Sequence, residues 1–295
     1  MPPASTETTF AFAPLAGVRV LSLALNLPGP AALLRCRTMG AHCLKFEPPA
    51  GDPMAHYNRD AYAALHEGVE VHTADLKTEE DREQLHRALA QTDVLLTSFR
   101  PSALAKLGLG WEPLHERHPA LSQVAIVGAP GARAEEPGHD LTYLAEYGLV
   151  NGTELPPTLF ADMGGALLAT EAVLQAVLHK RTGAGTGAGV YLEVALNAAA
   201  DWLALPRQWG LTQVHGAVGG AHAGYRVYPC ADGRVAVAAL EPHFAARLCD
   251  AAGLGTQDMM APSTRDAIAA WLHTRTRAEL DALARERDLP LLTLA

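Results

Sequence analysis

Hydrophobic positions in the first 130 residues fall into short runs that alternate with helical patterns. The run at 17–25 (GVRVLSLAL) is apolar and rich in valine and leucine, which is typical of a buried parallel strand. A turn at 26–30, a helix closed by Gly40 and a second strand follow within about 30 residues, and this order predicts a βαβ unit. The predicted strands span residues 17–25, 42–47, 69–76, 93–99 and 121–127.

The segments between these strands are predicted to be helices or loops. Residues 78–90 (TEEDREQLHRALA) predict a helix, because Thr78 can cap it and acidic residues in its first turn suit the macrodipole. Residues 102–110 predict a short helix stopped by glycine, and 50–68 is typical of a loop. Strands and helices that alternate in this way predict a doubly wound, mostly parallel, Rossmann-like α/β sheet.

A longer helix is expected at 163–181, where apolar residues recur at helical spacing. The glycine-rich stretch 182–189 (TGAGTGAG) ends it. This stretch resembles a phosphate loop, but it follows a helix and leads into a strand, which is the wrong order for a nucleotide cradle. We therefore expect a plain linker here. The turn at 26–30 is not G-x-G-x-x-G, so a dinucleotide fingerprint is absent as well.

The C-terminal part has a different pattern, which predicts a second, smaller α+β domain. Residues 225–240 read as two strands joined around Asp232-Gly233, a strong hairpin signal. Helices are expected at 240–255 and 264–287, and a last strand at 289–295. The predicted organisation is a large Rossmann-like domain at 14–197 that includes the long helix, a linker at 198–222 and a small domain at 223–295.

Composition narrows the possible functions. The 295 residues include 23 basic and 32 acidic side chains, for a net charge of −9, with no basic block. This balance argues against a nucleic-acid partner. The four cysteines form no C-x-x-C pair and are typical of reduced thiols in a cytoplasmic protein. Residues 1–13 lack the features of a signal peptide and are expected to be a frayed tail. The sequence contains no uninterrupted apolar run of 18 residues, so a membrane-spanning helix is not expected.

Two side chains carry the candidate chemistry, His139 and Asp162. Asp162 is closely followed by Gly164, Gly165 and the long helical pattern. An acid beside the open backbone N–H groups of a helix start is placed to act on an acyl or carbonyl group. The simpler interpretations are that Asp162 is an N-cap and that the Gly-His-Asp segment is a turn, since both are common.

Several stretches, in the same order, resemble the family III CoA-transferases, also called the CaiB/BaiF family, which includes the 2-methylacyl-CoA racemases. The resemblance covers about residues 14 to 255 of this sequence. The matching stretches are PLAGVRVLSLA, the PGP turn, GAHCLKFEPP, TADLK, DVLLTSFRPSALAKLGLGWEPL, PGHDLTYLAEYG, LFADMGG, HKRTGAGTGAGVYLEVAL and YPCADGRVAVAALEPHF.

The resemblance implies a role for each candidate residue. In the transferases the acid matched by Asp162 is a nucleophile that forms an anhydride and then an aspartyl-CoA thioester. In the racemases it is one base of a pair whose other member is matched by His139. The glutamate that orients this histidine across a dimer interface is matched by Glu241. Since all three racemase-type residues are present, the resemblance favours a racemase over a transferase.

The chemistry of racemisation agrees with this set. An enzyme must stabilise the enolate of a thioester, and the N–H groups at Gly164 and Gly165 could do so. Inversion needs an acid on one face and a base on the other. For coenzyme A, the resemblance implies a phosphate or adenine contact at Arg100. It also places Asp140 and Tyr143 near the pantetheine or the thioester.

Three departures from the family pattern support a further alternative, a degenerate homologue that binds without turnover. Residues 66–70 (HEGVE) are acidic where the family carries a basic cluster for the CoA phosphates. The segment before Gly138 is altered and acidic, and family members continue beyond the position of Ala295.

We therefore predict racemisation of a 2-methylacyl-CoA by His139 and Asp162, in a cytoplasmic homodimer, with an interlocked dimer as one alternative. Coenzyme A enters as a thioester substrate, and no prosthetic group, metal, nucleic acid or membrane is expected. The alternatives are CoA transfer between carboxylic acids through Asp162 and the non-catalytic homologue.

Overall fold

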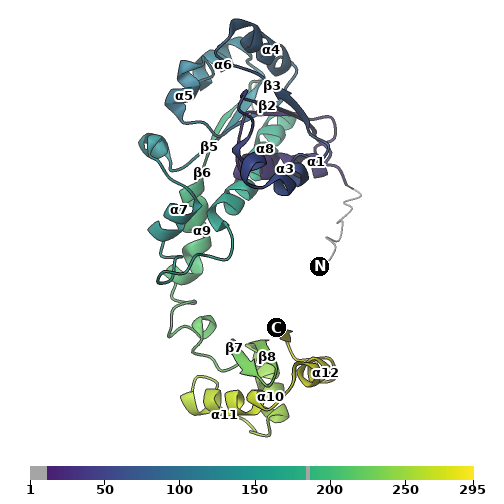
Figure 1. Ribbon diagram of the computed structural model, residues 1–295, viewed down its shortest axis with the longest axis vertical. Coiled ribbons are helices and arrows are strands. Elements are labelled where there is room, and N and C mark those ends of the chain that lie inside the picture. Colours follow the sequence, from purple (N-terminus) through teal and green to yellow (C-terminus); the bar gives the residue numbers. More distant parts are fainter. Residues whose placement is uncertain (1–11, 184–186) are drawn as a thin grey trace. The chain divides into compact units, whose positions relative to one another are not determined.

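The computed structural model describes residues 12–183 and 187–295. The chain divides into two compact units, Met1–Ala204 and Leu205–Ala295, which are described separately. The larger unit is built on a six-stranded sheet and the smaller one on a three-stranded sheet (Figure 1).

The large sheet is parallel throughout, and its strand order is β3-β2-β1-β4-β5-β6. The strands are β1 (Arg19–Ser22), β2 (His42–Glu47), β3 (Glu70–Thr73), β4 (Val94–Thr97), β5 (Ser122–Val127) and β6 (Tyr191–Ala195). Every residue of β4 and β5 is buried, as expected for strands covered on both faces. The predicted Rossmann-like sheet is confirmed, and its strand order reverses between β1 and β4.

Helices cover both faces of this sheet. Side chains alternate along each strand, so Val20 faces one layer of helices and Leu21 the other. The first layer holds α1 (Pro28–Thr38) and α8 (Phe160–Thr182), and the second holds α4 (Glu79–Leu89), α5 (Pro101–Lys106) and α6 (Trp111–Arg117) (Figure 1). Helix α8 is long and apolar enough to cross a membrane, but half of its most apolar window is buried and it packs on α1 and the sheet. It is a core helix.

Two predictions in this unit were wrong. The expected loop at 50–68 contains α2 (Pro53–Tyr57) and α3 (Arg59–Leu65), which are too short to show a hydrophobic period. They begin where Asp52 and Asn58 accept hydrogen bonds from the N–H groups of Met54 and Ala61. The expected turn at 26–30 extends into α1, because Pro28 occupies the first helical position, which proline favours.

The remaining elements of the large unit follow β5. They are the 3₁₀ helix η1 (Gly131–Glu135), α7 (Asp140–Glu146), α8 and α9 (Leu196–Gln208), the last of which runs across the boundary between the units. Gly183 ends α8 in the left-handed conformation. Residues 184–186 of the glycine-rich stretch, and residues 1–11 of the expected tail, lie outside the described residues.

The small unit contains an antiparallel sheet of order β7-β8-β9 with three helices. Its elements are η2 (Ala217–Gly219), β7 (Tyr225–Cys230), β8 (Gly233–Ala238), α10 (Pro242–Ala251), α11 (Pro262–His273), α12 (Arg277–Arg287) and β9 (Leu291–Leu294). The predicted hairpin and last strand are confirmed, whereas the single helix expected at 264–287 is two helices. The second begins at a capping box, in which Thr276 and Glu279 bind each other's backbone N–H groups.

Candidate active site at the switch point of the sheet

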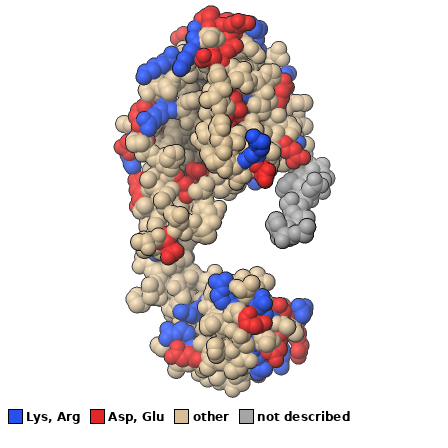
Figure 2. All heavy atoms as spheres, viewed as in Figure 1, with Lys and Arg blue, Asp and Glu red and all other residues tan. Residues whose placement is uncertain are grey.

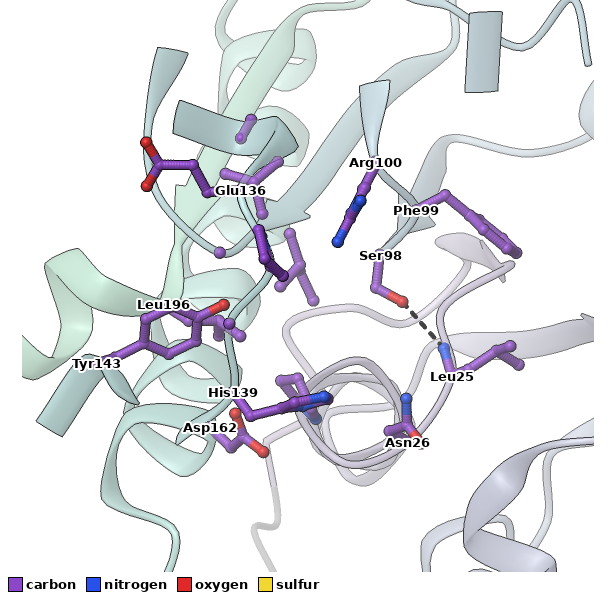
Figure 3. Close-up of a pocket in the computed structure, with 17 residues that line it drawn as sticks. Leu25, Asn26, Ser98, Phe99, Arg100, Glu136, His139, Tyr143, Asp162 and Leu196 are labelled. Atoms are coloured by element: carbon purple, nitrogen blue, oxygen red, sulfur yellow. Dashed lines mark hydrogen bonds between the residues drawn. The ribbon is translucent and has the colours of Figure 1, made fainter. Parts of the chain in front are cut away.

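A pocket of about 300 Å³ lies where β1, β4 and β5 end (Figure 3). In open α/β sheets, ligands bind beyond the carboxyl ends of the strands, at the point where the strand order reverses. The polar side chains around this pocket include Asn26, Ser98, Arg100, His139, Tyr143 and Asp162. The structure therefore brings Arg100, His139, Tyr143 and Asp162, which the sequence singled out separately, into one pocket.

Asp162 is the third residue of α8, so its carboxylate lies at the positive end of the helix dipole. Its backbone N–H donates a hydrogen bond to Oδ1 of Asp140, with the two atoms 3.0 Å apart. Burial is the main cause that raises the pKa of Asp162 to about 6; the Asp140 carboxylate adds to this rise, and His139 opposes it. At neutral pH the group is ionised, yet it is a stronger base than an ordinary aspartate.

His139 occupies the N-cap position of α7, in an extended backbone conformation. Its backbone N–H donates to Oγ1 of Thr142 at 3.0 Å, which leaves the imidazole to project from the helix start. The ring lies beside the Asp162 carboxylate in the pocket (Figure 3). The segment Gly-His-Asp is thus a helix start. The side chains of His139 and Asp162, which were expected to act as a pair, lie together in the pocket.

Asp140 and Tyr143 support the pocket from α7, and both are buried. Asp140 does not line the pocket; it holds the first turn of α8 through the hydrogen bond to Asp162. The Tyr143 ring packs on Gly128 and Gly138, and a Cβ at Gly138 would lie 2.6 Å from the tyrosine oxygen. Burial and the Asp162 charge raise the pKa of Tyr143, so its hydroxyl stays protonated and can donate.

Arg100 follows β4 at the N-cap position of α5, and its guanidinium points into the same pocket (Figure 3). A second, apolar recess of about 180 Å³ lies nearby and shares Phe99 with the first. Its lining includes Phe46, Pro48, Leu76, Lys77 and Phe99. Arg100 is therefore in the pocket that contains Asp162, and Lys77 is the cation beside the second recess.

The other predicted site residues lie elsewhere. Gly164 and Gly165 let α8 approach α9 closely, since a Cβ at Gly164 would lie 3.2 Å from Leu203 and one at Gly165 would collide with Leu196. A contact of these glycines with coenzyme A stays a prediction. Glu241 is an exposed residue of the small unit, at the N-cap position of α10. Its predicted action on His139 stays a prediction too.

Sequence reasoning missed Asn26 and Ser98, which also line the pocket. Ser98 Oγ accepts a hydrogen bond from the backbone N–H of Leu25 at 3.1 Å, joining the ends of β1 and β4. Asn26 has a backbone φ of 66°, in the left-handed region. The signal that could have found both residues is their position: each follows one of the two strands that flank the switch point.

Within the described parts of the chain, one buried group of side chains has the composition of a metal site: Glu47, Asp52 and His66. The ammonium of Lys45 already fills it, with Nζ 2.6 Å from Asp52 and 2.9 Å from Glu47. The donor set therefore does not fit a metal ion. The first residue of the acidic stretch 66–70 belongs to this buried cluster, whereas Glu67 and Glu70 are exposed.

Comparison with known proteins gives a family for the whole fold. The family model described as CoA-transferase family III matches residues 15–294. The chain is 30% identical to succinyl-CoA–D-citramalate CoA-transferase of Chloroflexus aurantiacus, over 94% of this chain and 77% of that protein. It is also 30% identical to the alpha-methylacyl-CoA racemase of Mus musculus, over 83% of this chain and 66% of the racemase.

A third relative has a known structure. The probable fatty acyl-CoA transferase Rv3272 of Mycobacterium tuberculosis is 32% identical over 57% of this chain, and the matched stretch spans about half (47%) of its length. Its crystal structure matches with a TM-score of 0.82 at 25% identity, covering 96% of this chain and 86% of the other.

Proposed function

Because this chain belongs to CoA-transferase family III, we propose that it transfers coenzyme A between carboxylic acids with Asp162 as the nucleophile. The sequence patterns favoured racemisation, but most of the named relatives are CoA-transferases, which supports the alternative. The observation that carries the proposal is the position of Asp162. It is a carboxylate with raised pKa, in the first turn of a helix, at the wall of the switch-point pocket.

The proposed reaction uses this carboxylate twice. Asp162 attacks the thioester carbonyl, the C–S bond breaks, and a mixed anhydride and the CoA thiolate form. The thiolate then attacks the Asp162 carbonyl, which releases the first acid as a carboxylate and leaves an aspartyl-CoA thioester. An acceptor carboxylate repeats both steps in reverse. Each step moves negative charge between oxygen and sulfur, so fixed donors around the pocket lower its barriers.

Two recesses support the binding of a molecule as long as coenzyme A. The switch-point pocket suits the acyl group and the thioester, since it contains Asp162 and Arg100. The second recess is apolar, with Phe46 and Phe99 in its lining, and suits a planar base. Lys77 and Arg100 supply positive charge for phosphates or carboxylates. Glu70 is the first residue of β3, whereas the second recess lies beyond the carboxyl end of that strand, so Glu70 does not face the recess.

We also propose that the protein is a homodimer, which is consistent with the apolar surface of α8 and α9. Figure 2 shows charged side chains concentrated over α4 and few around α9. The exposed apolar side chains of these two helices in the large unit are Phe160, Met163, Leu167, Leu178, Trp202 and Leu203. Large apolar side chains exposed along neighbouring helices are typical of an interface. Light scattering should give twice the chain mass, and Leu167→Glu should halve it.

Racemisation is the second candidate, and the observation that favours it is the pairing of His139 with Asp162 in one pocket. Incubation with a 2-methylacyl-CoA in D₂O separates the two reactions, if CoA transfer to free acids is measured in parallel. Transfer that survives in His139→Ala and vanishes in Asp162→Asn is the expected result. Deuterium at the α-carbon that is lost in both variants, without transfer, would establish the racemase instead.

A chemical trap tests the nucleophile directly. Borohydride reduces a thioester to an alcohol, so after incubation with an acyl-CoA it should convert Asp162 to the reduced residue. Mass spectrometry of the peptide that contains Asp162 reads this change, and Asp162→Asn is the control. An unmodified peptide from an enzyme that is turning over would overturn the covalent mechanism. A protein that fails to bind CoA by calorimetry would support the non-catalytic homologue.

A further inference from the structure

A buried polar cluster lies next to the active pocket, and the proposed mechanism does not use it. At its centre the side chain of Lys45, on β2, is fully buried. Its ammonium forms hydrogen bonds with Oδ2 of Asp52 at 2.6 Å and Nε2 of His66 at 2.8 Å, and an ion pair with Oε1 of Glu47 at 2.9 Å. A buried lysine is stable only when it is paired with opposite charge and hydrogen-bonded, and this one is both.

Hydrogen bonds around the cluster fix the state of each member. Nδ1 of His66 is 2.7 Å from the carbonyl oxygen of Tyr62, so Nδ1 carries the proton and Nε2 accepts from Lys45. Burial, and then the Lys45 charge, lower the pKa of His66, which favours this neutral form. The Tyr62 hydroxyl donates to Glu47 at 3.0 Å. The cluster is therefore a rigid anchor.

Asp52 connects this anchor to the pocket. Its Oδ2 faces Lys45, and its Oδ1 accepts from the backbone N–H groups of Asn26 at 3.0 Å and Met54 at 2.9 Å. Within the described part of the large unit, Asn26 is the one non-glycine residue in the left-handed region. Asparagine tolerates this conformation better than most residues. The anchored hydrogen bond to its N–H holds the Asn26 backbone in place.

The Asn26 side chain is oriented as well. The hydroxyl of Tyr57 donates to its Oδ1 at 3.3 Å, so the carboxamide oxygen is occupied and Nδ2 is the atom presented to the pocket (Figure 3). Burial, Asp52 and Asp162 raise the pKa of Tyr57, in this order, so the hydroxyl keeps its proton.

We propose that Asn26 is a catalytic residue whose Nδ2 donates a hydrogen bond to the carbonyl oxygen of the bound acyl-CoA. Tyr57, Asp52 and Lys45 are positioning residues that act through it. This inference rests on the proposed CoA-thioester chemistry. When Asp162 attacks, the carbonyl oxygen becomes negatively charged, and a donor fixed beforehand stabilises that charge more than it stabilises the ground state.

Substitutions of Asn26 separate the donor from the backbone conformation. Asn26→Gly keeps the left-handed backbone and removes the carboxamide, so we expect the wild-type unfolding midpoint, an unchanged KM and a kcat lower by about 10²-fold. Asn26→Ala should lose both kcat and stability, since alanine is strained at this φ. If Asn26→Gly keeps kcat within about twofold, while Asn26→Ala loses it, Asn26 has only a conformational role and the proposal is wrong.

The contribution of Tyr57 is tested by a double-mutant cycle. Tyr57→Phe should lower kcat about tenfold by releasing the carboxamide, and it should have no further effect when combined with Asn26→Gly. Equal effects of Tyr57→Phe in the two backgrounds would show that Tyr57 does not act through Asn26.

A spectroscopic experiment needs no turnover. Acetyl-CoA labelled with ¹³C at its carbonyl carbon is bound to Asp162→Asn, which cannot react. Its carbonyl resonance should move downfield on binding, and the added substitution Asn26→Gly should remove most of that shift. A bound resonance that is the same with and without Asn26 would overturn the inference while leaving the proposed function intact. Absence of any bound resonance would overturn the proposed function, and the inference with it.

Discussion

The backbone N–H of Asp162 and Oδ1 of Asp140 are 3.0 Å apart and form a hydrogen bond that joins the start of α8 to the start of α7. The bond does not touch the reacting carboxylate, but it places the Asp140 charge next to it. That charge is, after burial, the second cause of the raised pKa of Asp162. Asp140 therefore has two separable effects: it holds the first turn of α8 in position, and it raises the basicity of the Asp162 carboxylate.

The effect on basicity predicts a change in the pH profile. A nucleophilic carboxylate must be ionised, so kcat/KM of the wild type should fall tenfold per pH unit below about 6. Asp140→Asn keeps an oxygen that can accept from Asp162 and removes the charge, so the acidic limb should move to lower pH. Asp140→Ala also loses the hydrogen bond and should lower activity at every pH. An acidic limb that stays in place in Asp140→Asn would show that it reports another group.

The same pKa predicts a pH-dependent effect of Asp162→Asn on stability. The pKa of this acid is raised from 3.8 to about 6 by folding, so the folded protein binds the proton more tightly than the unfolded chain. The contribution of protonated Asp162 to the free energy of unfolding is therefore complete below pH 4 and is lost as pH rises to 6. Relative to wild type, Asp162→Asn should thus gain about 1–2 kcal/mol between pH 4 and pH 8, after a discount for partial exposure.

Urea unfolding of both proteins at several pH values measures this difference. The control is Asp266→Asn, which makes the same substitution at an exposed residue of the small unit. A free-energy difference between Asp162→Asn and wild type that is flat from pH 4 to pH 8 would contradict the raised pKa.

The sheet could be predicted from the sequence, whereas the short helices around the site could not. Each of its strands is a compact apolar run between turns, and β4 and β5 are buried along their whole length. By contrast, α3 buries none of its residues, so no hydrophobic period marks it. It depends on the cap at Asn58, which alone is a weak signal in the sequence, and on contacts with neighbouring elements, which the sequence pattern does not contain.

The candidate site also contains residues that could be predicted from the sequence and residues that could not. His139 and Asp162 were predicted because they stand in short patterns of their own, and the structure places both in one pocket. Asn26 was missed, since its backbone is held by Asp52, which is 26 positions away in the sequence. That contact depends in turn on Lys45 being buried. A network of this kind becomes visible only once the fold brings its members together.

Packing of Tyr143 on two glycines predicts a selective rescue. A Cβ at Gly128 would collide mainly with the tyrosine hydroxyl, whereas one at Gly138 would lie 2.6–2.8 Å from the hydroxyl and from two ring carbons. Gly128→Ala and Gly138→Ala should each cost about 1–3 kcal/mol of unfolding free energy by overpacking. Adding Tyr143→Phe should recover most of this loss for Gly128→Ala and little for Gly138→Ala. Thermal unfolding of the four variants tests this, and equal rescue of the two would contradict the packing.

Lys45→Met tests whether the buried cluster stabilises the fold as well as the pocket. The substitution leaves the carboxylates of Asp52 and Glu47 buried without their cation, so it should cost about 3–5 kcal/mol. Lys180→Met is the matched control: Lys180 pairs with Asp93 at 2.8 Å, but both side chains are partly exposed, so the loss should be below about 1 kcal/mol.

Because Lys45 acts on Asn26 only through Asp52, the Lys45→Met variant should also lose kcat at temperatures where it is still folded. Urea unfolding and kcat at 15 °C measure the two effects separately, and a Lys45→Met protein as stable as Lys180→Met would show that the cluster is not a closed, desolvated ion network.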